Sequence, residues 1–297
     1  MGSVDKDTSH SPINVLITGF APFKNDYPVN PSWEIARSLP EWLPPVRAKT
    51  AVPSDGPTSP ASPPHPLPPV RLIVHPEPIR VNYRRVRSLV PQLWHHRRHH
   101  PHHDHHDHDH DQDRDQDPSP DQRRLGTNAP DTDANRPHID LAIHIGMAGP
   151  RLYYSIERRG HRDGYDMADV DGELLRDGER RAREGRDWVW EGMPEELLTD
   201  FDVEDVLARW RRNSPKHMDL RISEDAGRYL CDFIYFSSLA HLYKAGERRK
   251  VLFLHVPSDA SEHSVQVGRE LVLQLVRSVV ESELTRSGGS KEEKLSE

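Results

Sequence analysis

Cysteine is almost absent from this 297-residue chain, since Cys231 is the only one. A single cysteine excludes a framework of internal disulfide bonds and fits a reducing compartment, so we expect a cytosolic protein. Apolar residues make up only 34% of the chain, and no run of them is long enough to cross a bilayer. Residues 1–12 also lack the apolar core of a signal peptide. The sequence therefore predicts neither a disulfide-stapled secreted protein nor a membrane protein.

A surplus of basic residues is lacking as well. The formal net charge is −8, from 40 Lys and Arg against 48 Asp and Glu. A nucleic-acid binder normally presents a basic face, so we expect no nucleic-acid partner. The length suffices for a sizeable core, but 27 prolines and 20 histidines indicate that part of the chain is not packed.

Short apolar runs alternate with helical patterns along most of the chain. Strands are predicted at residues 14–18, 46–52, 70–74, 139–145 and 251–256. Helices are predicted from residue 31 to 39, at 83–94, at 203–210, around Cys231 and at 265–284. This alternation is typical of a parallel-rich sheet covered on both faces. We therefore expect an α/β fold, a three-layer α/β/α sandwich with a mostly parallel, mixed central sheet.

Several local signals refine this prediction. Pro91 is expected to end its helix early, because proline lacks the amide hydrogen that continues a helix. Asp225 or Ser223 is expected to cap the helix that carries Cys231, and Gly246 to end it. We interpret residues 160–165 as a loop and 188–190 as a short extended piece.

Residues 95–136 break the globular pattern, because they contain almost no apolar side chain. We expect a disordered insertion in a single domain at 13–287, with a disordered tail at 1–12 and a polar tail at 288–297. The insertion holds a dense set of histidines, at positions 95, 96, 99, 100, 102, 103, 105, 106, 108 and 110. Such imidazoles could bind Zn, Ni or Cu weakly. A solvated loop is the simpler interpretation, and we predict no metal site.

The residues themselves suggest a nucleophile and its base. Cys231 is followed by His255, which lies near the end of a predicted strand, and Glu157 is a candidate third member. A thiol attacks carbonyls well only as thiolate, so it needs a proton acceptor and a group that orients that acceptor. The alternatives are a packing cysteine, a core histidine, and a Glu157 paired with Arg158 or Arg159.

Four ordered segments carry a further pattern. They are residues 18–23 (TGFAPF) with 30–34 (NPSWE), 146–149 (GMAG) with 155–158 (SIER), 223–231 (SEDAGRYLC) and 255–257 (HVP). Together these segments resemble the pyroglutamyl peptidase I family of cysteine peptidases, the pyrrolidone-carboxylate peptidases, and the order of the acid, thiol and imidazole residues is that of the family.

The resemblance implies a peptidase that removes N-terminal pyroglutamate from peptides. Cys231, His255 and Glu157 would form its catalytic triad and a thioester acyl-enzyme, with no metal or organic cofactor. The backbone N–H of Cys231 would help to bind the oxyanion.

The resemblance also implies an apolar pocket for the lactam ring. Phe20 and Phe23 match the aromatic residues that sandwich the ring, and Tyr229, Leu230 and Met147 would line the pocket beside the nucleophile. Aromatic faces suit a flat, uncharged amide.

Some features depart from the family pattern. Met147 stands where bacterial members usually have Gln, although residues 160–165 look like the eukaryotic branch, and residues 163–221 align poorly. Two alternatives therefore stay open: a noncatalytic relative that binds peptides, acts as a scaffold or holds metal through the histidine tract, and an unrelated cysteine hydrolase acting on amides. A homo-oligomer is also open, because some relatives assemble.

Overall fold

The computed structural model describes residues 11–23, 26–45, 67–94, 137–149 and 151–293. The predicted strand at 46–52 and the histidine-rich insertion at 95–136 lie outside the described residues. Residues 1–10 and 294–297 of the predicted tails lie outside them as well.

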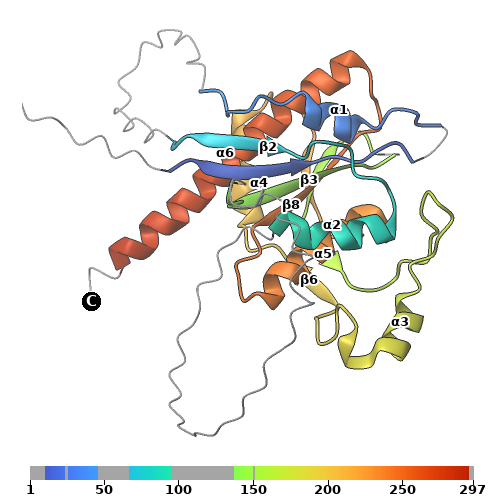
Figure 1. Ribbon diagram of the computed structural model, residues 1–297. Helices are drawn as coiled ribbons and strands as arrows, with labels where there is room; N and C mark the ends of the chain where they lie inside the picture. The colour runs from blue at the N-terminus through green and yellow to red at the C-terminus, as the bar shows by residue number, and fades with distance from the viewer. Residues whose placement is uncertain (1–10, 24–25, 46–66, 95–136, 150, 294–297) are drawn as a thin grey trace, which may run out of the picture.

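A six-stranded sheet forms the centre of the molecule, in the order β2-β1-β3-β8-β4-β7 (Figure 1). All neighbouring strands in it are parallel except β4 and β8, which are antiparallel. The strands are β1 (Ile13–Thr18), β2 (Val70–Val74), β3 (Leu141–Met147), β4 (Tyr154–Glu157), β7 (Leu220–Ser223) and β8 (Val251–Val256). The mostly parallel, mixed sheet predicted from the sequence is confirmed.

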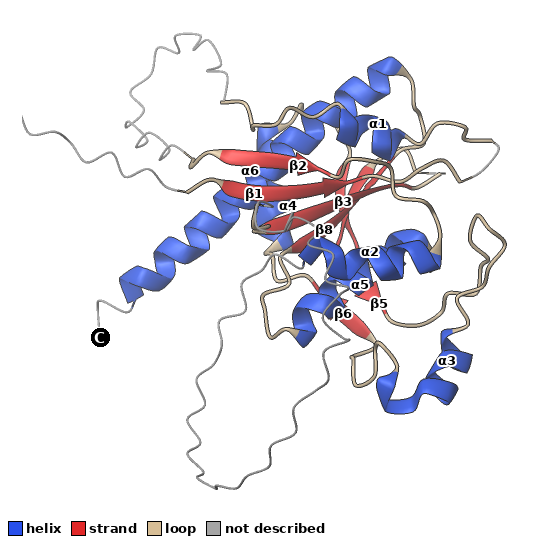
Figure 2. Cartoon of the chain, in the orientation of Figure 1, coloured by secondary structure: helices blue, strands red, loops and turns tan. Residues whose placement is uncertain are grey.

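Helices cover both faces of this sheet (Figure 2). One face packs against α1 (Pro31–Arg37), α4 (Val203–Asn213) and α6 (Glu262–Glu293), and the other against α2 (Tyr83–Trp94) and α5 (Leu230–Lys244). Every residue of β3 and β8 is buried, as expected for central strands covered on both sides. A separate pair, β5 (Arg159–His161) and β6 (Glu196–Leu198), and the short helix α3 (Asp177–Glu184) lie outside the sheet.

Four local predictions were wrong in whole or in part. Pro91 lies inside α2, which continues to Trp94, a residue whose side chain is buried in the core. The N-cap of α5 is Tyr229, with no side-chain hydrogen bond, because the segment around Asp225 forms a separate turn closed by its own hydrogen bonds. Residues 188–190 form a turn after α3, and the predicted 160–165 loop begins in β5.

Other boundaries agree with the sequence. Gly246 follows the end of α5 with a φ of +67°, a conformation that glycine adopts without strain. The last helix runs to Glu293, beyond the predicted residue 284 and into the expected polar tail. Across the described ranges, no helix combines the length and apolar character that a bilayer span requires.

Candidate active site

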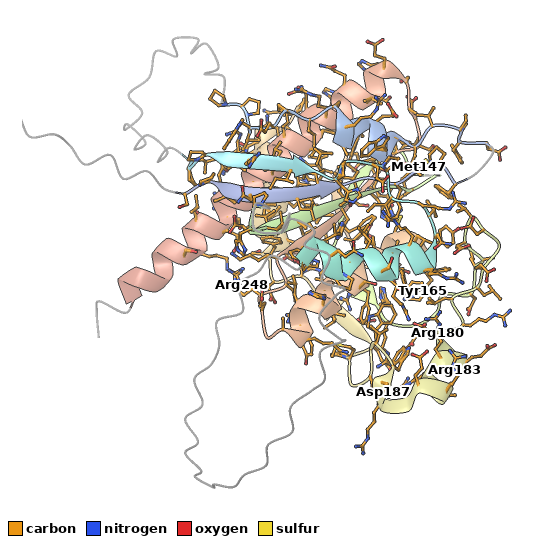
Figure 3. All side chains as sticks on the ribbon, in the orientation of Figure 1. Met147, Tyr165, Arg180, Arg183, Asp187 and Arg248 are labelled. Atoms are coloured by element: carbon orange, nitrogen blue, oxygen red, sulfur yellow. The ribbon has the colours of Figure 1, made fainter. Side chains whose placement is uncertain are left out.

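Three neighbouring parallel strands bring the predicted site segments together. In the sheet order, β1, β3 and β8 are adjacent, and Gly146 on β3 pairs in register with His255 on β8. The carboxyl ends of parallel strands share one edge of a sheet, where loops can gather reactive side chains. Figure 3 labels Met147, the last residue of β3, at that edge.

His255 and Glu157 form a buried pair. Nδ1 of His255 lies 2.7 Å from Oε1 of Glu157, and the two residues are 4% and 0% exposed. Glu157 ends β4, which runs antiparallel to β8, and Ser155 is the register partner of His255. Because a carboxylate only accepts, Nδ1 carries the hydrogen and Nε2 is left as the basic nitrogen. The sheet itself therefore sets the orientation of the imidazole.

Two further donors converge on the same oxygen of Glu157. Nη1 of Arg151 donates to Oε1 at 2.9 Å, and Oγ of Ser155 donates to it at 3.1 Å. Oε2 is buried and has no hydrogen-bond partner among the described residues. Arg158 and Arg159, the alternative partners considered from the sequence, pair instead with acidic residues at positions 196, 204 and 224. Nothing in the sequence alone pointed to Arg151 or Ser155.

Cys231 lies at the start of α5, facing the β3 strand end. It is the second residue of the helix and is partly exposed. A Cβ built on Gly146 would lie 2.8 Å from Sγ of Cys231, so the sulfur sits directly against the glycine that pairs with His255. The absence of a side chain at Gly146 leaves room for the thiol beside β8.

Burial raises the pKa of Cys231 to about 12, with the carboxylates of Glu157 and Asp232 as further causes and Arg151 opposing them. In the unliganded protein Cys231 is therefore a neutral thiol. The free amide groups in the first turn of α5 partly offset this rise in the pKa of the thiol, because they favour negative charge. The thiol lies closer to the helix start than the sequence predicted.

One pocket gathers all five predicted substrate-binding residues with the thiol. It is lined by Phe20, Phe23, Asn30, Val81, Met147, Tyr229, Leu230 and Cys231. Its volume of about 20 Å³ is close to that of one water-sized probe, so a lactam ring requires the pocket to widen. Phe23 and Tyr229 are the partly exposed rings of the lining, and their centroids are 6.2 Å apart.

Asn30 and Val81 are the lining residues that the sequence reasoning missed. The side chain of Asn30 accepts from the backbone and hydroxyl of Ser32 and donates to the carbonyl of Ala21. It thereby ties the 20–23 segment to the start of α1. The Asn-Pro-Ser pattern, a helix-capping signal, could have revealed this role.

A buried polar cluster lies beside the nucleophile and was also missed. Asp232 is fully buried, accepts from the hydroxyl of Tyr165 at 2.8 Å, and lies 3.1 Å from Nδ1 of His161. Burial raises the pKa of Asp232 despite these partners. The cluster ties β5 and the following loop to the first turn of α5.

His144 belongs to a different network, inside the core. Its Nδ1 is 2.8 Å from Oγ1 of Thr18, and its Nε2 is 2.9 Å from Oγ of Ser238. Burial lowers the pKa of His144 to about 3, so the ring is neutral at physiological pH. These contacts give His144 a structural role in the core.

No group of three or more metal-binding side chains occurs in the part of the chain that the structure describes. The histidine-rich tract lies outside that part. The fold and the site thus define the class: a three-layer α/β/α protein with a thiol, an imidazole and a carboxylate gathered at the strand ends.

Comparison with known proteins agrees with this class. A family model described as pyroglutamyl peptidase matches residues 127–270. Pyroglutamyl-peptidase 1 of Rattus norvegicus and of Homo sapiens are each 32% identical over 132 residues, which cover 44% of this chain and 56% of each relative. The match therefore spans little more than half the length of these relatives.

Solved structures extend the likeness of the fold. A mutant pyrrolidone carboxyl peptidase from Pyrococcus furiosus gives a TM-score of 0.55 at 18% identity, covering 91% of this chain and 99% of the other. Pyroglutamyl peptidase I from Bacillus amyloliquefaciens gives 0.54 at 15% identity, covering 92% and 95%. Residues 127–270 are thus similar to pyroglutamyl peptidases, and the fold is that of the pyrrolidone carboxyl peptidases.

Proposed function

We propose that this protein is a cysteine peptidase that removes N-terminal pyroglutamate from peptides. Cys231 is the nucleophile, His255 the general base and then acid, and Glu157 the residue that orients the imidazole. The observation that carries the proposal is the 2.7 Å contact between His255 and Glu157, at the strand end that also holds the sulfur of Cys231.

The chemistry begins from a neutral thiol. Because burial raises the pKa of Cys231, its proton leaves as the thiol attacks, and Nε2 of His255 accepts it. The sulfur bonds to the pyroglutamyl carbonyl carbon, and His255 then protonates the departing amine. Water, deprotonated by the same nitrogen, hydrolyses the thioester and releases pyroglutamate. Glu157 stabilises the imidazolium formed in both steps.

The start of α5 supplies a site for the oxyanion. Phe233 is the first residue whose amide bonds back into the helix, to the carbonyl of Tyr229. The amide of Cys231 is therefore free of intrahelical bonding and points out of the helix start. This donor stabilises the negative oxygen of the tetrahedral intermediate.

The pocket accounts for selectivity toward the lactam. Its lining is apolar apart from Asn30, whose side-chain groups already bond to protein atoms. An ordinary N-terminus carries a charge that such a lining would desolvate without compensation, whereas the lactam nitrogen is neutral. Met147 adds an apolar wall where a polar side chain was expected from bacterial relatives. The substrates are thus peptides that begin with pyroglutamate.

The experiment compares three amides of one fluorogenic amine: pyroglutamyl, prolyl and alanyl. Prolyl has a ring of the same size but a charged nitrogen, so it isolates the lactam contribution. We expect release from the pyroglutamyl amide alone, under reducing conditions with a chelator present, and none from the Cys231→Ala variant. Cleavage of all three amides at similar rates would favour a general amide hydrolase instead. No cleavage by folded wild-type protein would favour a noncatalytic peptide-binding relative.

A further inference from the structure

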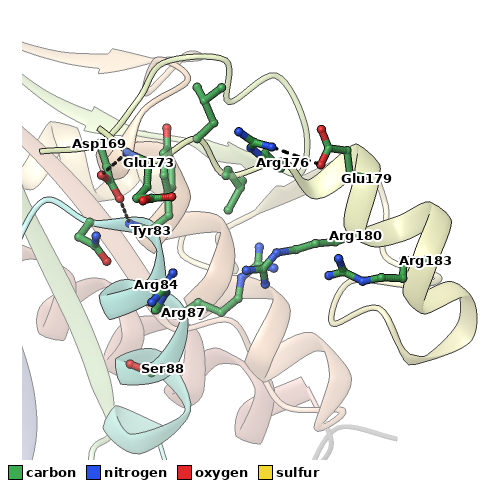
Figure 4. A pocket seen from close by; sticks show the side chains of 13 residues that line it. Tyr83, Arg84, Arg87, Ser88, Asp169, Glu173, Arg176, Glu179, Arg180 and Arg183 are labelled. Carbon is green, nitrogen blue, oxygen red and sulfur yellow. Dashed lines mark hydrogen bonds and ion pairs between the residues drawn. The ribbon is translucent and has the colours of Figure 1, made fainter. Parts of the chain in front are cut away.

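A second and larger cavity lies beside the lactam pocket. It has a volume of about 480 Å³ and lies between α2, residues 169–176 and α3 (Figure 4). Side chains from both helices point into the same space in that view. Five arginines line the cavity: Arg84, Arg87, Arg176, Arg180 and Arg183. We call it the arginine cleft.

The carboxylates of the cleft are fewer, and most are already engaged. Asp169 accepts from the backbone amides of Tyr83, Asp171 and Glu173, so its oxygens are used within the loop. Glu179 lies 3.8 Å from Arg176. The side chain of Glu173 forms no ion pair with any described residue. In the lining itself, arginines outnumber carboxylates by five to three.

Arg87 is a fixed wall of the cleft. It binds both carboxylate oxygens of Asp177, at 3.0 and 2.7 Å. Its guanidinium also lies over the rings of Trp190 and Phe233, 4.7 and 5.2 Å from their centroids. Because Asp177 binds the edge of this guanidinium and two aromatic rings lie against its face, it loses little conformational entropy when a ligand binds.

Arg84 and Arg180 both line the cleft, although the charge of Arg84 also helps, after the hydrogen bond from Arg80, to lower the pKa of Asp171. Neither forms an ion pair or a side-chain hydrogen bond with a described residue, whereas Arg183 has Glu184 at 3.2 Å. In Figure 4 the side chain of Arg180 extends from α3 toward α2, which carries Arg84 and Arg87. Like charges that line one cavity repel each other unless an anion lies between them.

An aromatic wall connects the arginine cleft to the lactam pocket. Phe23 and Tyr229 line the pocket, and Tyr83 lines the cleft. The ring centroid of Tyr229 is 6.2 Å from that of Phe23 and 6.1 Å from that of Tyr83. An extended peptide advances roughly 3.5 Å per residue. The cleft is therefore within reach of the second to fourth residue after a pyroglutamyl group bound beside Cys231.

We propose that the arginine cleft binds acidic side chains of the substrate, two to four residues after its pyroglutamyl group. This inference rests on the proposed peptidase function and names its preferred substrates: pyroglutamyl peptides with Asp or Glu close to their N-terminus. Arg84 and Arg180 contact the carboxylates, and Arg87 shapes the cleft between them.

The test uses two peptides that differ only in carrying Glu or Gln at the second and third residues after pyroglutamate. For the wild type we expect kcat/KM to be about three- to tenfold higher for the Glu peptide, the size of two partly exposed ion pairs. In the Arg84→Gln, Arg180→Gln double variant the ratio should fall to about one. High salt should lower the wild-type ratio as well.

Two controls separate the outcomes. A pyroglutamyl fluorogenic amide does not reach the cleft, so the double variant should cleave it at the wild-type rate. Arg212→Gln, on α4, removes an exposed arginine that lies 3.7 Å from Glu281 and does not line the cleft, and it should leave the ratio unchanged. A wild-type ratio of one, or a ratio that survives in the double variant, overturns the inference. Failure of the fluorogenic amide to react would instead overturn the peptidase function.

Discussion

Replacing Gly146 by alanine tests where the thiol lies. Gly146 is the last residue but one of β3 and pairs in register with His255, and an added Cβ would meet two side chains. It would lie 2.6 Å from Cζ of Phe253 and 2.8 Å from Sγ of Cys231. Both distances are shorter than real contacts of a Cβ, so the ring and the sulfur must move.

The size of the effect follows from these distances. Ordinary van der Waals contact with a Cβ begins at 3.4 Å, whereas Sγ of Cys231 would lie at 2.8 Å, so the sulfur has to move away by the difference between these two distances. Phe253 is fully buried between β8 and α5 and has little room to yield. Overpacking of this kind costs about 1–3 kcal/mol of stability. A displacement approaching 1 Å at the reacting atom lowers kcat/KM by roughly 100-fold.

Gly268→Ala is a matched control for this experiment. Its Cβ would meet the side chain of Ile35 at 2.3 Å, on the other face of the sheet. Thermal melts, cleavage of the pyroglutamyl amide and alkylation of Cys231 are measured for both variants. We expect both variants to lower the melting temperature, but only Gly146→Ala to lose activity. If Gly146→Ala keeps wild-type kcat/KM, the sulfur does not lie against β3 and the reasoning is refuted.

Four further changes address the charges around the thiol and in the core. Because the pKa of Cys231 is raised to about 12, its alkylation by iodoacetamide should accelerate about tenfold per pH unit from pH 7 to 9, and a plateau below pH 8 would reveal a preformed thiolate. Arg151→Met removes a hydrogen-bond donor to Glu157 and a positive charge that lowers the pKa of the Cys231 thiol. We expect kcat/KM to fall by about tenfold and the alkylation rate at pH 8 to fall as well. Unchanged rates would contradict this. Asp232→Asn should lower the free energy of unfolding by about 1–3 kcal/mol, because His161 and Tyr165 lose the carboxylate that they contact. The same variant should speed the alkylation of Cys231, since the Asp232 carboxylate raises the pKa of the thiol. Slower alkylation would contradict this prediction. The pKa of His144 is about 3 in the folded protein, below its unfolded value, so its contribution to the free energy of unfolding is fully present above pH 6.5 and is lost at roughly 1.4 kcal/mol per pH unit as the pH falls. Urea unfolding at pH 7 and pH 5 should therefore show a weaker pH dependence of stability for His144→Asn than for the wild type. An equal pH dependence of stability in the two proteins would refute this.

The strands of the fold were predictable where both faces are buried. Residues 70–74 and 251–256 are apolar runs bounded by turn residues, and they are the observed β2 and β8. The strand β4 was not predicted, because its sequence, YSIE, mixes polar and apolar residues. Its serine and glutamate face other polar side chains in the interior, which no local pattern reports.

The residues of the site were predictable by type and order but not by their supporting contacts. From the sequence, Glu157 was only a candidate third member of the triad. In the structure it ends β4, a strand antiparallel to the one that carries His255. Asp232 remained hidden because its partner Tyr165 lies 67 residues away along the chain. Arg151 lies only six residues before Glu157, but no local pattern shows that the loop before β4 turns its guanidinium back onto that carboxylate.

Covalent trapping tests the central claim most directly. Wild-type protein is mixed with a pyroglutamyl ester, quenched in acid within milliseconds, digested and analysed by mass spectrometry. A pyroglutamyl group on Cys231 in the wild type, and no modified peptide in Cys231→Ala, is the predicted result. A pyroglutamyl group on any other residue, or release of pyroglutamate by Cys231→Ala at the wild-type rate, would contradict the account.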